Sequence, residues 1–185
     1  MKKAAVLLTL VISLAGCSAE SELEQAMGFR DSLLSGNGSS FSAKVTADYG
    51  DELQEFTMDC RGDERGNVEF RVTSPETIAD ITGTISEAGG VLTFDDTALH
   101  FDLMAEDTLS PVSAPWIFLK TLRSGYIVSA CYEDELLRLS IDDSYDDDAL
   151  RLDIWLDGEK KPVRAEILHE GMRILTLDVK GFQIL

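Results

Sequence analysis

The sequence predicts a mainly β protein of the α+β class, built from a single curved antiparallel sheet that forms a half-barrel. An N-terminal and a mid-chain helix are expected to cover its concave side. Three observations predict this architecture. A helical apolar stripe occupies residues 22–35, apolar and polar residues then alternate almost to the C-terminus, and one dense apolar cluster at 111–124 interrupts the alternation. A sheet with this many strands has to curl or split, and the two helices are the available cover.

The first sixteen residues predict a secretion signal. Two lysines precede an apolar run over 4–14, which is too short to span a bilayer core of about 30 Å. The run ends in Leu14-Ala15-Gly16-Cys17, which resembles the bacterial lipobox. That resemblance implies a diacylglycerol on the Cys17 thiol and cleavage before Cys17. The alternative is a general signal peptide cut near Ala19, with Cys17 an incidental apolar residue.

The lipobox resemblance divides the chain into three parts. We expect a lipoprotein signal peptide over 1–16, a lipidated tether over 17–21 and one half-barrel domain over 22–185. Acyl chains stabilise membrane attachment by about 0.8 kcal/mol per buried CH₂. Two chains therefore anchor a protein stably, whereas one chain binds the membrane only weakly and reversibly. The predicted location is therefore the extracytoplasmic face of the cell membrane, with the protein anchored by lipid.

Residues 22–35 carry the signals of a helix at both ends. Ser21 is placed to cap the helix, and Glu24 three residues later completes a capping box. Gly36-Asn37-Gly38 ends the segment. The apolar stripe between these ends consists of Leu23, Ala26, Met27, Leu33 and Leu34.

From Phe41 onward the period of the apolar residues changes from 3.6 to 2, which is typical of half-buried strands. Before the cluster, strands are expected at 41–49, 56–60, 68–72, 78–85, 91–94 and 99–101. After the cluster, strands are expected at 126–132, 136–141, 150–156, 163–168 and 174–179. Glycine and aspartate mark the turns, with Asp157-Gly158 the clearest hairpin signal, so an antiparallel meander is the simplest topology.

The segment 111–124 is too densely apolar for a half-exposed strand, and it ends at Gly125. We interpret it as a short helix. Its structural interpretation is a plug at one end of the sheet, and its functional interpretation is a lid over an apolar cavity. The candidate lid residues are Trp116, Phe118 and Leu119, and the candidate lining residues are Phe70, Phe101, Leu103, Leu152 and Ile154.

The negative charge of the chain excludes nucleic acid as a partner. The chain has 34 acidic and 16 basic residues, a formal charge of -18, whereas nucleic-acid binding needs a basic surface that releases counterions. Without Lys2 and Lys3 the mature chain carries -20, because 14 basic residues then face the same 34 acidic ones. Such a charge also opposes broad adsorption to anionic headgroups, so membrane attachment is expected to depend on the lipid at the N-terminus.

The sequence offers little catalytic chemistry, and we expect neither a metal nor another cofactor. His100 and His169 are the only histidines, and neither has the spacing of a metal site or a triad. The acidic run 142–148 has hard oxygen ligands that suit calcium, but it lacks the glycine and distal glutamate of an EF-hand, which favours a solvated turn. Cys60 and Cys131 are expected to be buried free thiols rather than a disulfide.

The order of these elements resembles the lipoprotein-carrier superfamily, the half-barrel fold of LolA, LolB and the mycobacterial lipid-binding lipoproteins. The lipid anchor and small size also resemble the clostridial GerS-like spore-germination lipoproteins, which implies a cell-wall amidase as partner in cortex processing. The residues that carry the resemblance are Glu22 to Ser35, Phe41 to Tyr49, Val68 to Pro75, the helix at Trp116, Leu156-Asp157-Gly158 with Lys161-Pro162-Val163, and Gly181-Phe182.

We therefore expect a non-catalytic, membrane-anchored lipoprotein. It would bind either a protein partner or the acyl chain of a lipid or lipoprotein in its concave face. The soluble carrier of the superfamily is not lipidated, so Cys17 favours a fixed receptor over a shuttle, and the acidity of the chain favours a basic partner surface. The alternative is a hydrolase that acts on the cell wall through clustered carboxylates with shifted pKa values.

Overall fold

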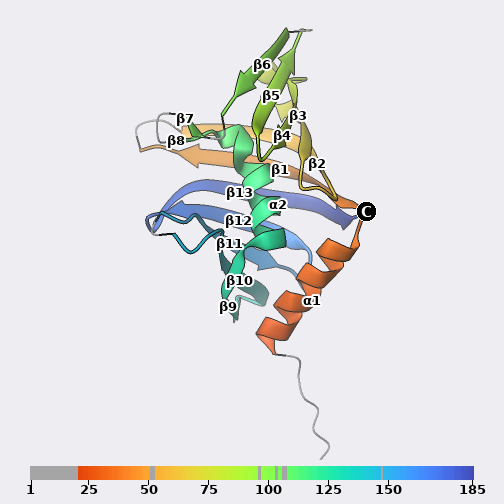
Figure 1. Cartoon of the computed structure of the whole chain (residues 1–185), viewed down its shortest axis with the longest axis vertical. Coiled ribbons are helices and arrows are strands. Elements are labelled where there is room, and N and C mark those ends of the chain that lie inside the picture. Colours follow the sequence, from red (N-terminus) through yellow and green to blue (C-terminus); the bar gives the residue numbers. More distant parts are fainter. Residues whose placement is uncertain (1–20, 51–52, 96, 103, 106–107, 147) are drawn as a thin grey trace, which may run out of the picture.

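The computed structural model describes residues 21–185 except 51–52, 96, 103, 106–107 and 147. The expected signal peptide, Cys17 and Leu103 lie outside the described residues. Within the described part, eleven strands form one open antiparallel sheet with two helices, as the sequence predicts (Figure 1). The strands occur in the order β6-β5-β4-β3-β2-β1-β13-β12-β11-β10-β9.

The large sheet consists of two meanders. The first contains β1 (Gly38–Asp48), β2 (Leu53–Asp63), β3 (Val68–Ser74), β4 (Thr82–Ser86), β5 (Gly89–Phe94) and β6 (Thr97–Phe101). The second contains β9 (Tyr126–Glu133), β10 (Leu136–Asp142), β11 (Arg151–Leu156), β12 (Pro162–His169) and β13 (Met172–Ile184). The short strands β7 (Met104–Ala105) and β8 (Thr108–Leu109) pair separately between the two meanders.

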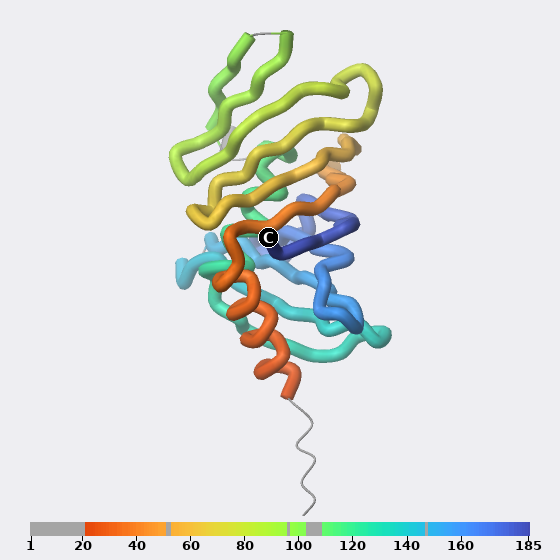
Figure 2. Tube along the Cα trace, turned by 90° about the vertical axis from the view of Figure 1, so that its right-hand side faces the viewer, coloured from red at the N-terminus to blue at the C-terminus, as the bar shows by residue number. Residues whose placement is uncertain are grey.

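The two meanders are joined through β1, the first strand of the first meander, and β13, the last strand of the second. β1 pairs antiparallel with β13, with Ala43 opposite Val179 and Val45 opposite Leu177. All four side chains are buried, so the inner face continues without interruption across the junction. At the end of this pairing the amide of Asn37 donates to the carbonyl of Leu185 at 2.7 Å. The C-terminus therefore lies in the middle of the sheet, beside the start of β1 (Figure 2).

Helix α1 (Glu22–Ser35) has the predicted boundaries and the predicted capping box. The backbone N–H of Glu24 donates to Ser21 Oγ at 3.2 Å, and the backbone N–H of Ser21 donates to Glu24 Oε2 at 2.8 Å. The buried side of the helix is formed by Ala26, Phe29 and Leu33. The Phe29 ring packs against Phe182 of β13, with ring centroids 6.4 Å apart.

Helix α2 (Ala114–Ser124) follows the 3₁₀ turn η2 (Pro111–Ser113) and confirms the predicted mid-chain helix, whose first three residues form that turn. Each helix places an arginine on the C-terminal end of the other. Arg30 of α1 donates to the carbonyls of Leu122 and Gly125, both at 2.8 Å, and Arg123 of α2 donates to the carbonyl of Leu33 at 3.3 Å. Each guanidinium group thus donates to carbonyls that lack a hydrogen-bond partner within their own helix. Each also lies at the negative, C-terminal end of that helix's dipole.

One predicted strand is shorter in the structure. The segment expected as a strand at 78–85 begins with the 3₁₀ turn η1 (Glu76–Ile78), and β4 starts only at Thr82. Asp80 has a φ of 68°, which lies in the left-handed region and cannot continue a strand. The Asp80 N–H nevertheless donates to the carbonyl of Val72 at 2.9 Å, which holds this turn against β3. Alternating apolar residues did not reveal the turn because the pattern carries no information on φ.

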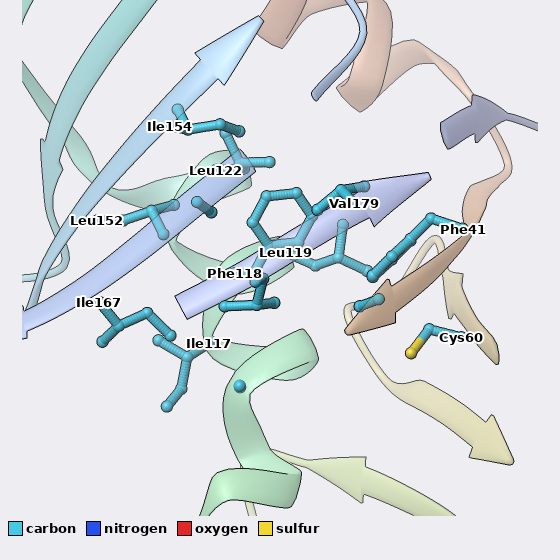
Figure 3. Close-up of a cluster of buried hydrophobic side chains, with 14 of the residues drawn as sticks. Phe41, Cys60, Ile117, Phe118, Leu119, Leu122, Leu152, Ile154, Ile167 and Val179 are labelled. Atoms are coloured by element: carbon cyan, nitrogen blue, oxygen red, sulfur yellow. The ribbon is translucent and has the colours of Figure 1, made fainter. Parts of the chain in front are cut away.

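Phe118 of α2 is the central side chain of the core. Its ring meets Phe41 of β1 at a centroid distance of 5.4 Å and Phe182 of β13 at 6.3 Å, both edge to face. Figure 3 shows Phe118 and Leu119 between Phe41 and Val179 on one side and Leu152 and Ile154 on the other. The space under α2 is occupied by these side chains.

We expect Phe118→Ala to lower the free energy of unfolding by about 3–5 kcal/mol, because the substitution removes a fully buried ring and leaves a cavity. Phe94→Ala is the matched control, since the same atoms are removed from a side chain that is 56% exposed, and a loss below about 1 kcal/mol is expected. Urea denaturation followed by circular dichroism measures both values. Equal losses for the two variants would contradict the central position of Phe118.

Candidate functional site

The described lid and lining residues lie on the inner face and belong to one hydrophobic core, with Phe101 packed against it. Trp116, Phe118 and Leu119 of α2 are buried, and Leu152 and Ile154 of β11 are buried beneath the same helix. Phe70 of β3 is also buried, and Phe101 of β6 is half-buried. Phe101 and Ile154 are eight strands apart in the sheet order, roughly 38 Å along the curve at about 4.8 Å per strand. The structure therefore brings together the residues around β11 and α2, and it places Phe101 at the far edge of the same core, on the end strand β6.

The inner face of β5 and β6 extends beyond α2. The register places Leu92 opposite Leu99, Phe94 opposite Thr97 and Gly90 opposite Phe101, so these side chains share the face that carries the core. Leu99 is 63% exposed and Phe94 is 56% exposed, whereas Leu92 and Phe101 are partly buried against the core. We call Leu92, Phe94, Leu99 and Phe101 the uncovered inner face.

Two glycines make room for aromatic rings on this side of the sheet. A Cβ on Gly90 would lie 2.1 Å from the Phe101 ring, and a Cβ on Gly83 would lie 2.6 Å from the Phe70 ring. Each ring therefore covers the glycine on the neighbouring strand, which keeps the sheet packed where α2 does not reach. The aromatic partners of these two glycines are visible only from the strand register.

The opposite face of the same hairpin is less apolar. Thr93 and Ala98 are partners in the register, as are Val91 and His100, and Thr84 lies beside Val91 on β4. β6 is also an end strand of the large sheet and leaves one set of backbone groups without a strand partner among the described residues. The hairpin thus combines an exposed apolar face with a free strand edge, the two features that favour contact with another macromolecule.

A groove lies along α1, at the other half of the sheet. It encloses about 630 Å³ between α1, the turn that joins β11 and β12, and the last residues of β13. Phe29 and Phe182 contribute apolar surface, and Lys160 and Lys161 contribute positive charge. Lys160 has a φ of 60°, and its ammonium group donates to Gln25 of α1 and lies 5.7 Å from the centre of the Tyr132 ring. Lys160 therefore joins the turn to α1 and β9.

The carboxylates whose pKa departs from its usual value have structural partners. The capping box with Ser21 lowers the pKa of Glu24, and the hydrogen bond from Lys44 lowers the pKa of Glu55. Burial acts to raise the pKa of Asp63, but hydrogen bonds from Asn67 and Arg65 outweigh it and lower the value. A general acid needs a raised pKa at neutral pH, so these shifts have the opposite sign.

The outer face of the second meander contains a buried carboxylate. Asp153 accepts a hydrogen bond from Arg138 at 2.6 Å, and Trp155 lies between Arg138 and Arg164, with guanidinium-to-ring distances of 5.2 and 5.0 Å. This cluster was not predicted from the sequence, although Asp153 and Trp155 alternate with the inner-face residues of β11. The contact with Asp153 raises the pKa of Arg138, so the pair is a charged structural contact on the side away from the core.

The acidic run between β10 and β11 forms a turn held by its own hydrogen bonds. Asp142 forms an ion pair with Arg151 at 2.8 Å, and Asp143 accepts the backbone N–H of Leu150 at 2.9 Å. No group of three potential metal ligands is found among residues 21–185 as far as they are described. His100 is exposed on β6 and His169 lies half-buried at the end of β12.

The expectation of two buried thiols is half wrong. Both cysteines are free, and Cys60 is buried, but Cys131 is exposed. Cys60 shares the inner face with Phe41 and Phe70, whereas Cys131 lies opposite Arg138 on the outer face of β9. β9 is an end strand with one neighbour in the sheet, so nothing from a second neighbouring strand covers Cys131.

Comparison with known proteins gives structural neighbours but no sequence family. No family model matches the chain, and no curated protein matches it. A LolA superfamily protein from Nitrosomonas europaea has 7% identity and a TM-score of 0.43, covering 86% of this chain and 93% of that one. Lipoprotein LppX from Mycobacterium tuberculosis has 15% identity and a TM-score of 0.41, covering 87% and 92%.

MucB is also similar in structure. In the MucA/MucB complex of Pseudomonas aeruginosa, the matched chain has 15% identity and a TM-score of 0.41, with 86% of this chain and 56% of that chain covered. These values describe a similar course of the chain and do not define an activity. Among the described residues, no helix has the length and apolar character needed to cross a membrane.

We expect the two thiols within the described residues to differ in reactivity. Burial raises the pKa of the Cys60 thiol, and the nearby Asp59 charge acts in the same direction, so Cys60 stays protonated and unreactive at pH 8. In a Cys17→Ser background, Ellman's reagent should modify one thiol in the native protein and two in denaturant. Cys131→Ser should remove the native signal, and a native signal that persists in that variant would contradict the burial of Cys60.

Proposed function

We propose that this protein is a non-catalytic binding protein, anchored by lipid on Cys17 to the extracytoplasmic face of the membrane, that recognises a protein partner. The partner is proposed to contact the uncovered inner face and the free edge of β6. The observation that carries the proposal is the contrast between two parts of one surface. Phe118 and its neighbours fill the space under α2, whereas Leu99 and Phe94 on the continuation of the same face are exposed.

The position of this surface supports a partner away from the membrane. The tether would leave the domain at the start of α1, which lies at one end of the molecule in Figure 1, and β5 and β6 lie at the opposite end. The net charge of -20 on the mature chain also keeps the domain off an anionic bilayer. An apolar face presented at that distance from the anchor is suited to a protein that is not embedded in the lipid.

The proposed partner is a protein of any kind, which is a broader class than the amidase that the sequence resemblance implies. The GerS-like resemblance implies a cell-wall amidase, and no feature of the described residues selects that enzyme over another protein. The acidity of the chain supports a partner with a basic rim around an apolar centre.

A second candidate is the binding of an acyl chain, and the groove along α1 favours it. Its volume of about 630 Å³ lies within the usual range for small-molecule sites, with apolar surface from Phe29 and Phe182 and two lysines. Mass spectrometry of an organic extract from the purified protein distinguishes the two candidates. A stoichiometric lipid that is lost in Phe29→Asp would support the acyl-chain site. The hydrolase alternative has less support, since the resolved carboxylate shifts lower the pKa.

For the partner surface, Leu99→Asp should weaken binding of the partner at least tenfold, because a carboxylate would enter an apolar contact. Ala98→Asp is the matched control, since Ala98 is exposed on the opposite face of the same strand. A photo-crosslinking residue at 99 should give one discrete protein adduct in cells, and the same residue at 98 should not. Equal adducts from both positions, or unchanged partner affinity in Leu99→Asp, would sink the proposal.

For the anchor, Cys17→Ser should release the protein from the membrane fraction, because the acyl chains attach through that thiol. Fractionation and incorporation of labelled fatty acid measure the change, and Ser18→Ala serves as the control that should remain bound. Retention of Cys17→Ser in the membrane fraction with the fatty-acid label would show that the lipobox interpretation is wrong.

A further inference from the structure

A hollow of about 600 Å³ opens between α2, the end of α1 and two turns of the first meander. The turns are those between β2 and β3 and between β4 and β5. This hollow lies apart from both the uncovered inner face and the groove along α1, with which it shares no lining residue. Its chemistry is independent of the proposed function.

Three cationic side chains line the hollow. They are Arg65 from the turn between β2 and β3, and Lys120 and Arg123 from α2. None of them forms an ion pair with a carboxylate within the described residues, although seven other basic side chains of the domain do. Arg123 is held in place by two neutral carbonyls, those of Leu33 at 3.3 Å and Glu64 at 3.0 Å. Its positive charge therefore has a fixed position and no anionic partner.

Trp116 adds a hydrogen-bond donor to the same wall. Only 6% of its surface is exposed, and the Lys120 ammonium group lies 5.0 Å from the centre of its ring. The indole N–H makes no hydrogen bond to any described residue, and it does not belong to the buried polar atoms that lack a partner. A buried indole usually finds an acceptor, so Trp116, which lines this hollow without one among the described residues, has a donor that a ligand could use.

The balance of charge at the hollow is the reverse of that of the whole chain. Glu64 and Glu87 also line it, so three cations and two carboxylates leave a net charge of +1, against -18 for the chain. Anions are repelled by most of this surface. At this hollow an anion would meet Lys120 and Arg123, and also Arg65, whose charge acts on the nearby Asp63 without forming an ion pair. The lining offers guanidinium, ammonium and indole N–H donors from α2 and from the turn between β2 and β3, which suits the three acceptor oxygens of a phosphate better than the two of a carboxylate.

From this juxtaposition we infer that the hollow beside Trp116, Lys120, Arg123 and Arg65 binds a phosphate-bearing anion. The phosphate belongs either to a soluble molecule or to a lipid headgroup. The hollow includes Leu34 near the C-terminal end of α1, and the tether precedes Glu22, roughly 18 Å away at 1.5 Å per residue. This separation from the membrane anchor favours a soluble source.

The test is a titration of the purified Cys17→Ser protein with sodium phosphate at constant ionic strength, followed by the indole N–H signals in ¹H–¹⁵N spectra. We expect a saturable shift of the Trp116 signal. The Trp155 signal should stay in place, because its indole N–H already donates to Glu133 at 3.2 Å. Trp116→Phe assigns the two signals. Chloride and succinate at the same ionic strength should have less than a tenth of the effect, and an equal response to either would overturn the inference.

Matched variants locate the site. Lys120→Gln combined with Arg65→Gln should raise the dissociation constant for phosphate at least tenfold, whereas Lys180→Gln, an exposed lysine on β13, should leave it unchanged. The dispersion of the backbone signals shows that each variant is folded. Unchanged affinity in the folded double variant would overturn the site.

A second arm distinguishes the two sources of phosphate. Sedimentation with phosphatidylglycerol vesicles that is reversed by soluble phosphate would assign the site to a lipid headgroup. Binding of soluble phosphate without sedimentation would assign it to a soluble ligand. Binding of neither would overturn the inference.

Discussion

The pairing of β1 with β13 is the constraint on which the rest of the structure depends. Each meander is built from local hairpins, but only this contact between the two ends of the domain joins them into one sheet. The pairing also puts Phe41 and Phe182 side by side, with ring centroids 5.8 Å apart, and so creates the floor on which Phe118 rests. Without this long-range contact, α2 would have no single inner face to cover.

The length of α2 then decides which part of that face is covered. Eleven residues give a helix of about 16 Å, whereas eleven strands spaced by about 4.8 Å extend over roughly 48 Å of curved sheet. The helix fills the centre, α1 covers part of the second meander, and the inner face of β5 and β6 remains exposed. The exposed apolar surface is therefore a consequence of geometry, since the same alternation of residues runs through covered and uncovered strands.

Two arginines that reach from one helix to the other hold α1 and α2 together on the inner face of the sheet. Arg30 and Arg123 each donate to carbonyls at the end of the other helix, and their positive charge also suits the negative end of its dipole. Arg123 also reaches the carbonyl of Glu64 and so connects the helix pair to the turn between β2 and β3. The same contacts fix one positive charge at the hollow beside Trp116, so the packing of the helices and the chemistry of that hollow share a residue.

The sequence by itself determined the features that depend on neighbours within a few residues. The capping box of Ser21 and Glu24, the end of α1, the period-two strands and a helix within 111–124 all follow from such local patterns. The tertiary structure decided which side chains are buried, because burial depends on residues far away in the chain. Cys60 and Cys131 lie in similar alternating segments, yet one is buried in an interior strand and the other is exposed on an end strand. Likewise Leu99 and Leu139 both lie on the inner face. Leu139 is buried on the interior strand β10, which α2 contacts, whereas Leu99 is exposed on the end strand β6. Alternation specifies which side chains share a face, whereas the cover on that face comes from residues far away in the chain.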